Sequence, residues 1–359
     1  MNSLSLQQAA GQVLIAGFME NELPQDIVEA IHSKSLGGII LFKRNIQNLE
    51  QTQSLLHNAH SCAPEDAPIL SSVDQEGGRV SRLSAPFLQL PAMRTLAQYN
   101  DPGFTERCAF IFGTQLRALG FTMDFAPVLD IHTNPQNPVI GDRAFGENAE
   151  QVIEHGGAFA RGLRQAGILS CGKHFPGHGD TISDSHETLP RLEHSLTRLK
   201  AIELEPFRTL ATAVDAIMTA HIIFPELDSK YPATLSPSIL ATLARQYCCF
   251  NGIIISDDLD MKAISNNHSI ADAAVLAIEA GCDALLVCQD PQSRLKAQEG
   301  LRKAAEKSLS FENKLRAAVD RFSTLRTKQH KKKQVRLSLE QSLNLPEINE
   351  VKKRLESVL

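Results

Sequence analysis

The chain lacks the charge expected of a nucleic-acid-binding protein. Its formal net charge is −5 and its sequence pI is about 6.2, whereas nucleic-acid binding needs a strongly basic surface. One basic run, from Lys328 to Arg336, lies near the C-terminus, and we interpret it as a solvated segment between helices. We therefore expect no nucleic-acid partner.

The chain also lacks the patterns of a zinc, redox or membrane protein. Its seven cysteines are an odd number, and no Cys-x-x-Cys pair signals a structural zinc site or a redox motif. No apolar run reaches the ~18 residues of a membrane span. The first residues show no basic region followed by an apolar core, so we expect no signal peptide. These absences predict a cytoplasmic protein with reduced thiols and no membrane partner.

Short apolar runs separated by amphipathic stretches are the main structural signal. With 43% hydrophobic and 21% charged residues, the chain has enough apolar material for a large core. Several runs, such as 252–256 and 284–288, are apolar on both faces, as buried parallel strands require. The predicted strands are 13–18, 38–42, 68–73, 122–128, 168–172, 216–220, 252–256 and 284–288.

Eight such strands alternating with helices predict a single α/β domain, a (β/α)8 TIM-type barrel. Helices are expected over 151–166, 195–213 and 270–280, and Ser5 with Gln8 predicts a capping box. An open doubly wound sheet is the competing fold, but a dinucleotide-binding version would carry Gly-x-Gly-x-x-Gly after its first strand, and none is present. We place the barrel at 1–300 and a helical extension with the basic segment at 301–359.

The segment 173–186 has the highest density of titratable groups. It contains a lysine, three histidines and two aspartates, and Pro176, Gly177 and Gly179 exclude a regular helix. Because it follows an apolar run, we predict a shaped loop that hangs from a strand, where enzymes commonly keep catalytic groups.

Polar residues follow five successive predicted strands. They include Asp74 and Arg82, then Asp130 and Arg143, Lys173 with His174, His221, and finally Asp257 with Asp258. Barrel enzymes place their chemistry at the carboxyl ends of the strands. The sequence therefore predicts one active site at this rim.

The available groups indicate carboxylate and imidazole chemistry. The chain has neither a Gly-x-Ser-x-Gly elbow nor a Gly-Lys-Ser/Thr phosphate loop. A carboxylate such as Asp257 suits attack on a sugar carbon. His186, oriented by Asp184, suits protonation of the departing oxygen. The cations Arg82, Arg143 and Lys173 can donate hydrogen bonds to the hydroxyl groups of a sugar, and Asp74 can accept hydrogen bonds from them.

Three motifs resemble glycoside hydrolase family 3. They are Asp74-Gln-Glu-Gly-Gly-Arg-Val, Lys173-His-Phe-Pro-Gly-His-Gly with Asp184-Ser-His186, and Ile255-Ser-Asp257-Asp-Leu. They occur in the order typical of the family, and the resemblance as a whole covers roughly residues 10 to 300. More narrowly, they are similar to the NagZ-type β-N-acetylglucosaminidases of bacterial peptidoglycan recycling.

The resemblance implies a role for each matching residue. Asp257 would be the nucleophile, and His186 the general acid/base with Asp184 as its partner. N-acetylglucosamine in the −1 subsite would be bound by Asp74, Arg82, Arg143, Lys173 and His174. The implied reaction releases N-acetylglucosamine, with retention, from a β-1,4 linkage to 1,6-anhydro-N-acetylmuramic acid, with or without its stem peptide.

Chain length and composition bear on this assignment. Nothing after residue 300 resembles the second α/β domain that supplies the acid in many family members, so the acid must come from the barrel. The chain has no Trp and only three Tyr, whereas sugar sites often stack rings on aromatic side chains. Either polar recognition by Arg and Lys carries more of the binding, or Phe175 and other Phe residues substitute for the missing aromatics. We expect a monomer whose partner is a small muropeptide or disaccharide.

Other functions stay open at this point. A metal-dependent barrel hydrolase would use His174, His178, His186 and Asp257, although Pro176 and Gly177 remove the helix on which the His174–His178 spacing would place two ligands. A phosphorylase on the same scaffold is a second possibility, because a histidine acid repels phosphate less than a carboxylate does. A binding barrel without catalysis is a third. We expect no metal and no cofactor.

Overall fold

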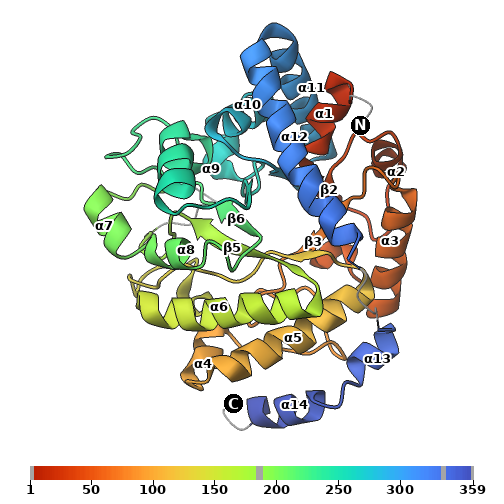
Figure 1. The fold of residues 1–359 in the computed structure, drawn as a ribbon, viewed down its shortest axis with the longest axis vertical. Helices are drawn as coiled ribbons and strands as arrows, with labels where there is room; N and C mark the ends of the chain where they lie inside the picture. The colour runs from red at the N-terminus through yellow and green to blue at the C-terminus, as the bar shows by residue number, and fades with distance from the viewer. Residues whose placement is uncertain (1–3, 183–188, 333–336, 357–359) are drawn as a thin grey trace.

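Eight parallel strands form a barrel in the computed structural model, which describes residues 4–182, 189–332 and 337–356 (Figure 1). The strands are β1 Leu14–Ala16, β2 Gly38–Leu41, β3 Leu70–Val73, β4 Met123–Asp124, β5 Leu169–Phe175, β6 Ala216–Thr219, β7 Ile253–Ile255 and β8 Leu285–Val287. Each pairs with its neighbour in sequence, and β1 pairs with β8. A parallel bridge between Ile255 and Ala284 joins β7 to β8. The predicted (β/α)8 barrel is confirmed.

Helices surround the barrel and follow the strands along the chain (Figure 1). They are α1 Leu6–Gln12, α2 Gln25–His32, α3 Leu49–Cys62, α4 Met93–Gln98, α5 Pro102–Leu119, α6 Ala149–Ala166, α7 Leu196–Ala201, α8 Glu205–Thr209, α9 Lys262–Ser265, α10 Ile270–Ala280, α11 Pro291–Lys307, α12 Leu309–His330, α13 Leu339–Leu343 and α14 Ile348–Glu356. Shorter helical segments are η1 Lys43–Asn45, η2 Gly141–Arg143, η3 Ala233–Leu235 and the π-helical η4 Ser238–Tyr247. None of the helices in the described ranges is long and apolar enough to cross a membrane.

Local sequence signals placed the carboxyl ends of two helices and the start of a third correctly. α6 ends at Gly167 (φ 81°) and α10 at Gly281 (φ 115°), both in the left-handed conformation that glycine adopts readily. The capping box at Ser5 is also present. The single helix expected over 195–213 was wrong, because the chain breaks between α7 and α8. Pro206, in the first turn of α8, has no N–H to donate to the preceding turn, so a continuous helix cannot form.

Alternating side chains divide the core into an inner and an outer part. Ile15 of β1 points into the barrel, where it joins Ile40, Leu70 and residues of the other strands, whereas its neighbours Leu14 and Ala16 pack outward against the helices. This is the period of two expected of strands buried on both faces.

Helix α12 closes the amino-terminal end of the barrel. Phe322 enters the inner core cluster. The buried Arg326 donates to the carbonyl oxygens of Gly37 (2.9 Å) and Pro68 (3.1 Å) and to Gln12 Oε1 (2.6 Å), next to the starts of β2 and β3. Burial lowers the pKa of Arg326 to about 9. The opposite, carboxyl end therefore remains for the site. The division of the chain at residue 300 stays a prediction.

Candidate active site

A small cavity of about 180 Å³ opens at the carboxyl ends of the strands. Six of the eight predicted site residues line it, namely Asp74, Arg82, Arg143, Lys173, His174 and Asp257. The other two, Asp184 and His186, lie outside the described residues. Apolar side chains, among them Ile40, Phe42, Phe125, Met218 and Leu286, form much of the remaining wall.

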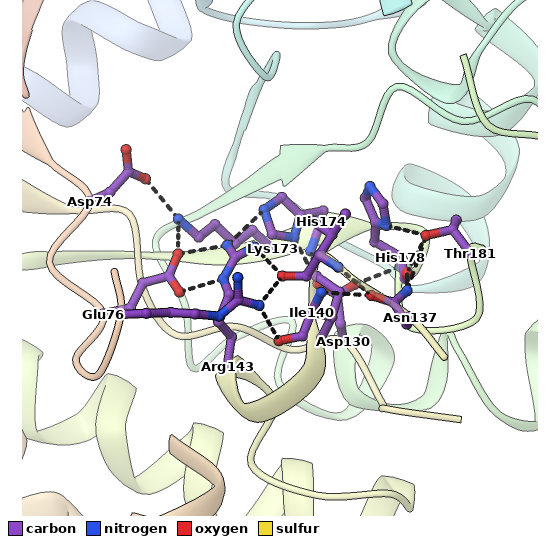
Figure 2. A network of polar contacts seen from close by, with 12 residues as sticks. Asp74, Glu76, Asp130, Asn137, Ile140, Arg143, Lys173, His174, His178 and Thr181 are labelled. Atoms are coloured by element: carbon purple, nitrogen blue, oxygen red, sulfur yellow. Dashed lines mark hydrogen bonds and ion pairs between the residues drawn. The ribbon is translucent and has the colours of Figure 1, made fainter. Parts of the chain in front are cut away.

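Two carboxylates and two cations that line the cavity form one network of ion pairs (Figure 2). Lys173 Nζ lies 2.7 Å from Asp74 Oδ1 and 2.6 Å from Glu76 Oε1. Arg143 binds Glu76 through two nitrogens, at 2.8 and 2.9 Å. Arg82 approaches Asp74 from the other side at 3.7 Å. This arrangement fixes charged donors beside Asp74 in a place largely shielded from water.

Mutual pairing keeps these buried groups charged. Burial alone would raise the pKa of Glu76, but the charges of Arg143 and Lys173 outweigh it and hold the pKa far below its usual value. Burial would likewise lower the pKa of Lys173, and the carboxylates of Asp74 and Glu76 raise it instead. The site thus keeps an ammonium group and a guanidinium group at neutral pH.

His174 is held in one orientation by Asp130. Its Nδ1 lies 2.7 Å and its backbone N 3.1 Å from Asp130 Oδ2, and its Nε2 lies 3.5 Å from Arg143 Nη2. The backbone here differs from the prediction. Lys173 and His174 belong to β5, which continues to Phe175 with an irregular register against β6 and a cis peptide bond between Lys173 and His174. The strand continues because Lys173 and Phe175 still pair with Met218 and Thr219 of β6, at a place where Lys173 and His174 are buried.

The shaped loop begins only after Phe175. Gly179 packs against the backbone of Ile131, where a Cβ would lie 1.7 Å from the Ile131 carbonyl oxygen, so only glycine fits. His178 is buried, and its Nδ1 lies 2.8 Å from Thr181 Oγ1. Burial lowers the pKa of His178 to about 4, with a further contribution from the charge of His174. His178 is therefore neutral at pH 7.

Asp257 follows β7 and faces the same cavity. Its Oδ1 accepts a hydrogen bond from the backbone N of Asp258 at 2.8 Å. The Asp258 carboxylate turns toward β8 and accepts from the backbone N of Cys288 at 3.0 Å. Burial, with the nearby Asp260, raises the pKa of Asp258 to about 7. The two adjacent aspartates thus differ in environment, and Asp258 ties the end of β7 to the end of β8.

The sequence left Glu76 and Asp130 without a role, and Asp124 unnoticed. Glu76 had a usable signal, because it lies in the same motif as Asp74 directly after β3, and both carboxylates contact Lys173. Asp130 reaches His174 and His178 across 44 and 48 residues, and no local pattern announces such a contact. Asp124 is fully buried at the end of β4, and burial raises its pKa well above the usual value.

The described residues contain no group of three or more His, Cys, Asp or Glu side chains that could hold a metal ion. His174 and His178 lie with ring centres 5.8 Å apart, and their Nδ1 atoms face Asp130 and Thr181, respectively. The metal site considered from the sequence includes His186, which lies outside the described part of the chain. Metal dependence is therefore a matter for experiment.

Glu76→Gln is expected to destabilise the protein and to weaken substrate binding. The change leaves Lys173 and Arg143 buried with a single carboxylate, Asp74, and losing one partner of a buried ion pair costs about 3–5 kcal/mol. We expect at least a roughly tenfold higher KM, since the donors would lose their fixed positions. Denaturant unfolding and steady-state kinetics measure the two effects.

Asp283→Asn is the matched control for Glu76→Gln. Asp283 is a buried carboxylate that also binds two cations, Arg245 at 2.7 Å and Arg321 at 2.6 Å, but it precedes β8, away from the cavity. Both arginines are partly exposed, so we expect a smaller loss of about 1 kcal/mol and an unchanged KM. An equal rise in KM in both variants would contradict a binding role for the Glu76 cluster.

Acidification between pH 6.5 and pH 4 is expected to destabilise the fold through His178. The unfolded chain takes up a proton at the ordinary histidine pKa of about 6.5, whereas the folded state resists it down to about 4. The unfolded state therefore binds more protons in this window, and the free energy of unfolding falls as pH falls, by about 3 kcal/mol for this residue. Denaturant unfolding of wild type and His178→Asn across the window tests this. Parallel pH curves would contradict it.

Known proteins resemble this chain in both sequence and fold. Residues 5–325 match the family model described as the glycosyl hydrolase family 3 N terminal domain. A beta-hexosaminidase of Pseudomonas aeruginosa is 39% identical over 279 residues, which are 77% of this chain and 82% of that protein. A glycoside hydrolase family 3 beta-N-acetylglucosaminidase from Paenibacillus sp. str. FPU-7 superimposes with a TM-score of 0.92 at 39% identity, covering 99% of this chain and 69% of that one.

A second solved structure has a chain of similar length. Native NagZ from Neisseria gonorrhoeae gives a TM-score of 0.82 at 30% identity and covers 96% of this chain and 97% of that one. The match to the family model spans most of the sequence and includes all three motifs that carried the resemblance. The chain belongs to glycoside hydrolase family 3.

Proposed function

We propose that this glycoside hydrolase is a retaining exo-β-N-acetylglucosaminidase that forms a covalent glycosyl-enzyme. Its substrate would be N-acetylglucosamine β-1,4-linked to 1,6-anhydro-N-acetylmuramic acid, with or without a stem peptide, in cell-wall recycling. The beta-hexosaminidase and beta-N-acetylglucosaminidase relatives support the glycoside class, and the similarity to NagZ supports the recycling role. We further propose that the protein acts as a monomer in the cytoplasm.

The proposal rests chiefly on one observation, that the proposed nucleophile and the proposed sugar-binding groups line the same cavity. Asp257 lines the same small space as the charged donors Lys173 and Arg143 and the acceptor Asp74. Donors held by buried ion pairs would bind the hydroxyl groups of one sugar ring and present its anomeric carbon to the Asp257 carboxylate. A cavity of about 180 Å³ suits recognition of one terminal sugar residue, hence exo action.

Asp257 would attack the anomeric carbon while an acid protonates the departing oxygen. The C–O bond to the leaving sugar breaks, and a bond to Asp257 forms. Water then attacks the same carbon, gives its proton to the former acid, and frees Asp257, which leaves the product with the original β configuration. We propose His186, paired with Asp184, as the acid and then the base.

Aryl β-glycosides that differ only at C2 test the proposal. We expect turnover of the 2-acetamido glycoside and little of the 2-hydroxy glycoside, with β-N-acetylglucosamine as the first anomer detected by NMR. The anhydro-disaccharide, with and without its peptide, tests the natural aglycone. Failure to hydrolyse any N-acetyl-β-glucosaminide would overturn the proposal.

Two added reagents separate the alternative functions. Sugar 1-phosphate formed in phosphate buffer would identify a phosphorylase. Activity lost to EDTA and restored by zinc or manganese would identify a metal-dependent hydrolase. We expect neither effect.

A further inference from the structure

We infer that Asn137 is a positioning residue that fixes the loop of Arg143 and the loop of His178 as one unit. The inference rests on the proposed function, in which Arg143 binds the sugar and the segment after His178 supplies the acid. Asn137 lies in the long connection after β4, is only 5% exposed, and bridges the two loops in Figure 2.

The side-chain amide of Asn137 uses its full hydrogen-bonding capacity. Its Oδ1 accepts from the backbone N of Val139 at 2.9 Å and of Ile140 at 2.7 Å. Its Nδ2 donates to the carbonyl oxygen of His178 at 2.8 Å and to Thr181 Oγ1 at 3.0 Å. A primary amide has two donor hydrogens and two acceptor lone pairs. All four are engaged, so the amide has one orientation.

The acceptor side of Asn137 shapes the turn that carries Arg143. The Ile140 carbonyl accepts from the backbone N of Arg143 at 2.9 Å, and the Val139 carbonyl accepts from its Nη1 at 3.2 Å. Arg79 braces the same turn by donating to the Val139 carbonyl at 2.5 Å and the Ile140 carbonyl at 3.1 Å. This side fixes the backbone that carries Arg143, whose guanidinium is also held by Glu76.

The donor side of Asn137 fixes the start of the histidine loop. Thr181 Oγ1, which accepts from Asn137, lies 2.8 Å from His178 Nδ1, and the backbone N of His178 donates to Asp130 at 2.7 Å. Residue 182 is the last described residue before the segment with Asp184 and His186. Asn137 therefore fixes His178 and Thr181, which precede the proposed acid-bearing segment in the sequence.

Asn137→Asp separates the two sides. Aspartate keeps both acceptor bonds to the turn of Arg143 but loses both donors, so the His178 carbonyl faces a carboxylate. We expect kcat for the disaccharide to fall about 10- to 100-fold, as small displacements of catalytic groups commonly cause, and KM to change less than about threefold. Arg79→Met removes the bonds to the carbonyl oxygens of Val139 and Ile140 and so perturbs only the turn that carries Arg143. This variant should show the reverse, a raised KM with kcat nearly unchanged.

A matched pair of threonines separates positioning from stability. Thr181 Oγ1 and Thr105 Oγ1 each lie 2.8 Å from a histidine Nδ1 in a buried pair, His178 and His155, respectively. The Thr105 pair joins α5 and α6, outside the cavity. Thr181→Val should follow Asn137→Asp in kcat. Thr105→Val should lower Tm similarly and keep wild-type kinetics.

Three results would overturn the inference: equal kinetics for Thr181→Val and Thr105→Val, a raised KM without a fall in kcat in Asn137→Asp, or an Asn137→Asp enzyme that changes only in Tm.

If wild type cleaves no N-acetyl-β-glucosaminide, the proposed function fails, and a crystal structure of Asn137→Asp decides the inference separately. We then expect an unchanged turn at 139–143 with displaced His178 and Thr181, and an undisplaced loop would refute the positioning role.

Discussion

Asp257→Ala is expected to lose on the order of 10³-fold or more in turnover, as removal of a covalent nucleophile generally does. Asp257 lines the cavity together with the charged groups and the apolar side chains, and without its carboxylate no glycosyl-enzyme can form. Steady-state kinetics on an aryl N-acetyl-β-glucosaminide measures the loss. Azide should partly restore turnover by direct attack and yield the α-glycosyl azide, since a single displacement inverts the anomeric carbon.

A mechanism-based fluorinated sugar identifies the attacking residue independently. We expect mass spectrometry of the labelled wild-type enzyme to find the sugar on Asp257. Asp258→Asn is the matched control, because Asp258 is adjacent but directs its carboxylate to the backbone N of Cys288. It should keep the label on Asp257, although turnover can fall as the end of β7 loosens. A label on Asp258 or Asp74 would refute the assignment.

His186→Ala is expected to slow the natural disaccharide far more than an activated nitrophenyl glycoside. General-acid help matters most for a poor leaving group, and such catalysis contributes about 10²- to 10⁴-fold. For the nitrophenyl substrate, formation of the glycosyl-enzyme should stay fast while its hydrolysis loses the base. Stopped-flow measurement should therefore show a burst of nitrophenol, and the steady state should show a lowered KM.

Azide separates a proton-transfer role from a binding role for His186. Azide needs no base, so it should accelerate the variant and yield the β-glycosyl azide, opposite in configuration to the product expected from Asp257→Ala. Asp184→Asn should show the same pattern more weakly if Asp184 orients the imidazole. Equal slowing of both substrates with no azide effect would make His186 a sugar ligand and leave the acid unidentified.

The sequence by itself determined the barrel and the rim on which the site lies. Strands buried on both faces must be short, continuous apolar runs, and eight such runs alternating with helices have few other solutions. Because parallel strands bring their carboxyl ends to one side, Asp74, Lys173 and Asp257 could be placed together from their predicted positions after the third, fifth and seventh strands, and all three line the cavity. Glycine at the ends of α6 and α10 fixed those boundaries locally.

Only the tertiary structure decided how these side chains are held. The double ion pairing of Glu76, the hold of Asp130 on His174 and the four hydrogen bonds of Asn137 join residues as many as 97 positions apart (Lys173 minus Glu76). Burial at the barrel mouth also extended β5 through Lys173 and His174, where the sequence predicted a loop. Apolar periodicity records which face of an element is buried, whereas a polar contact depends on the positions of two distant backbones, and no local pattern contains that information.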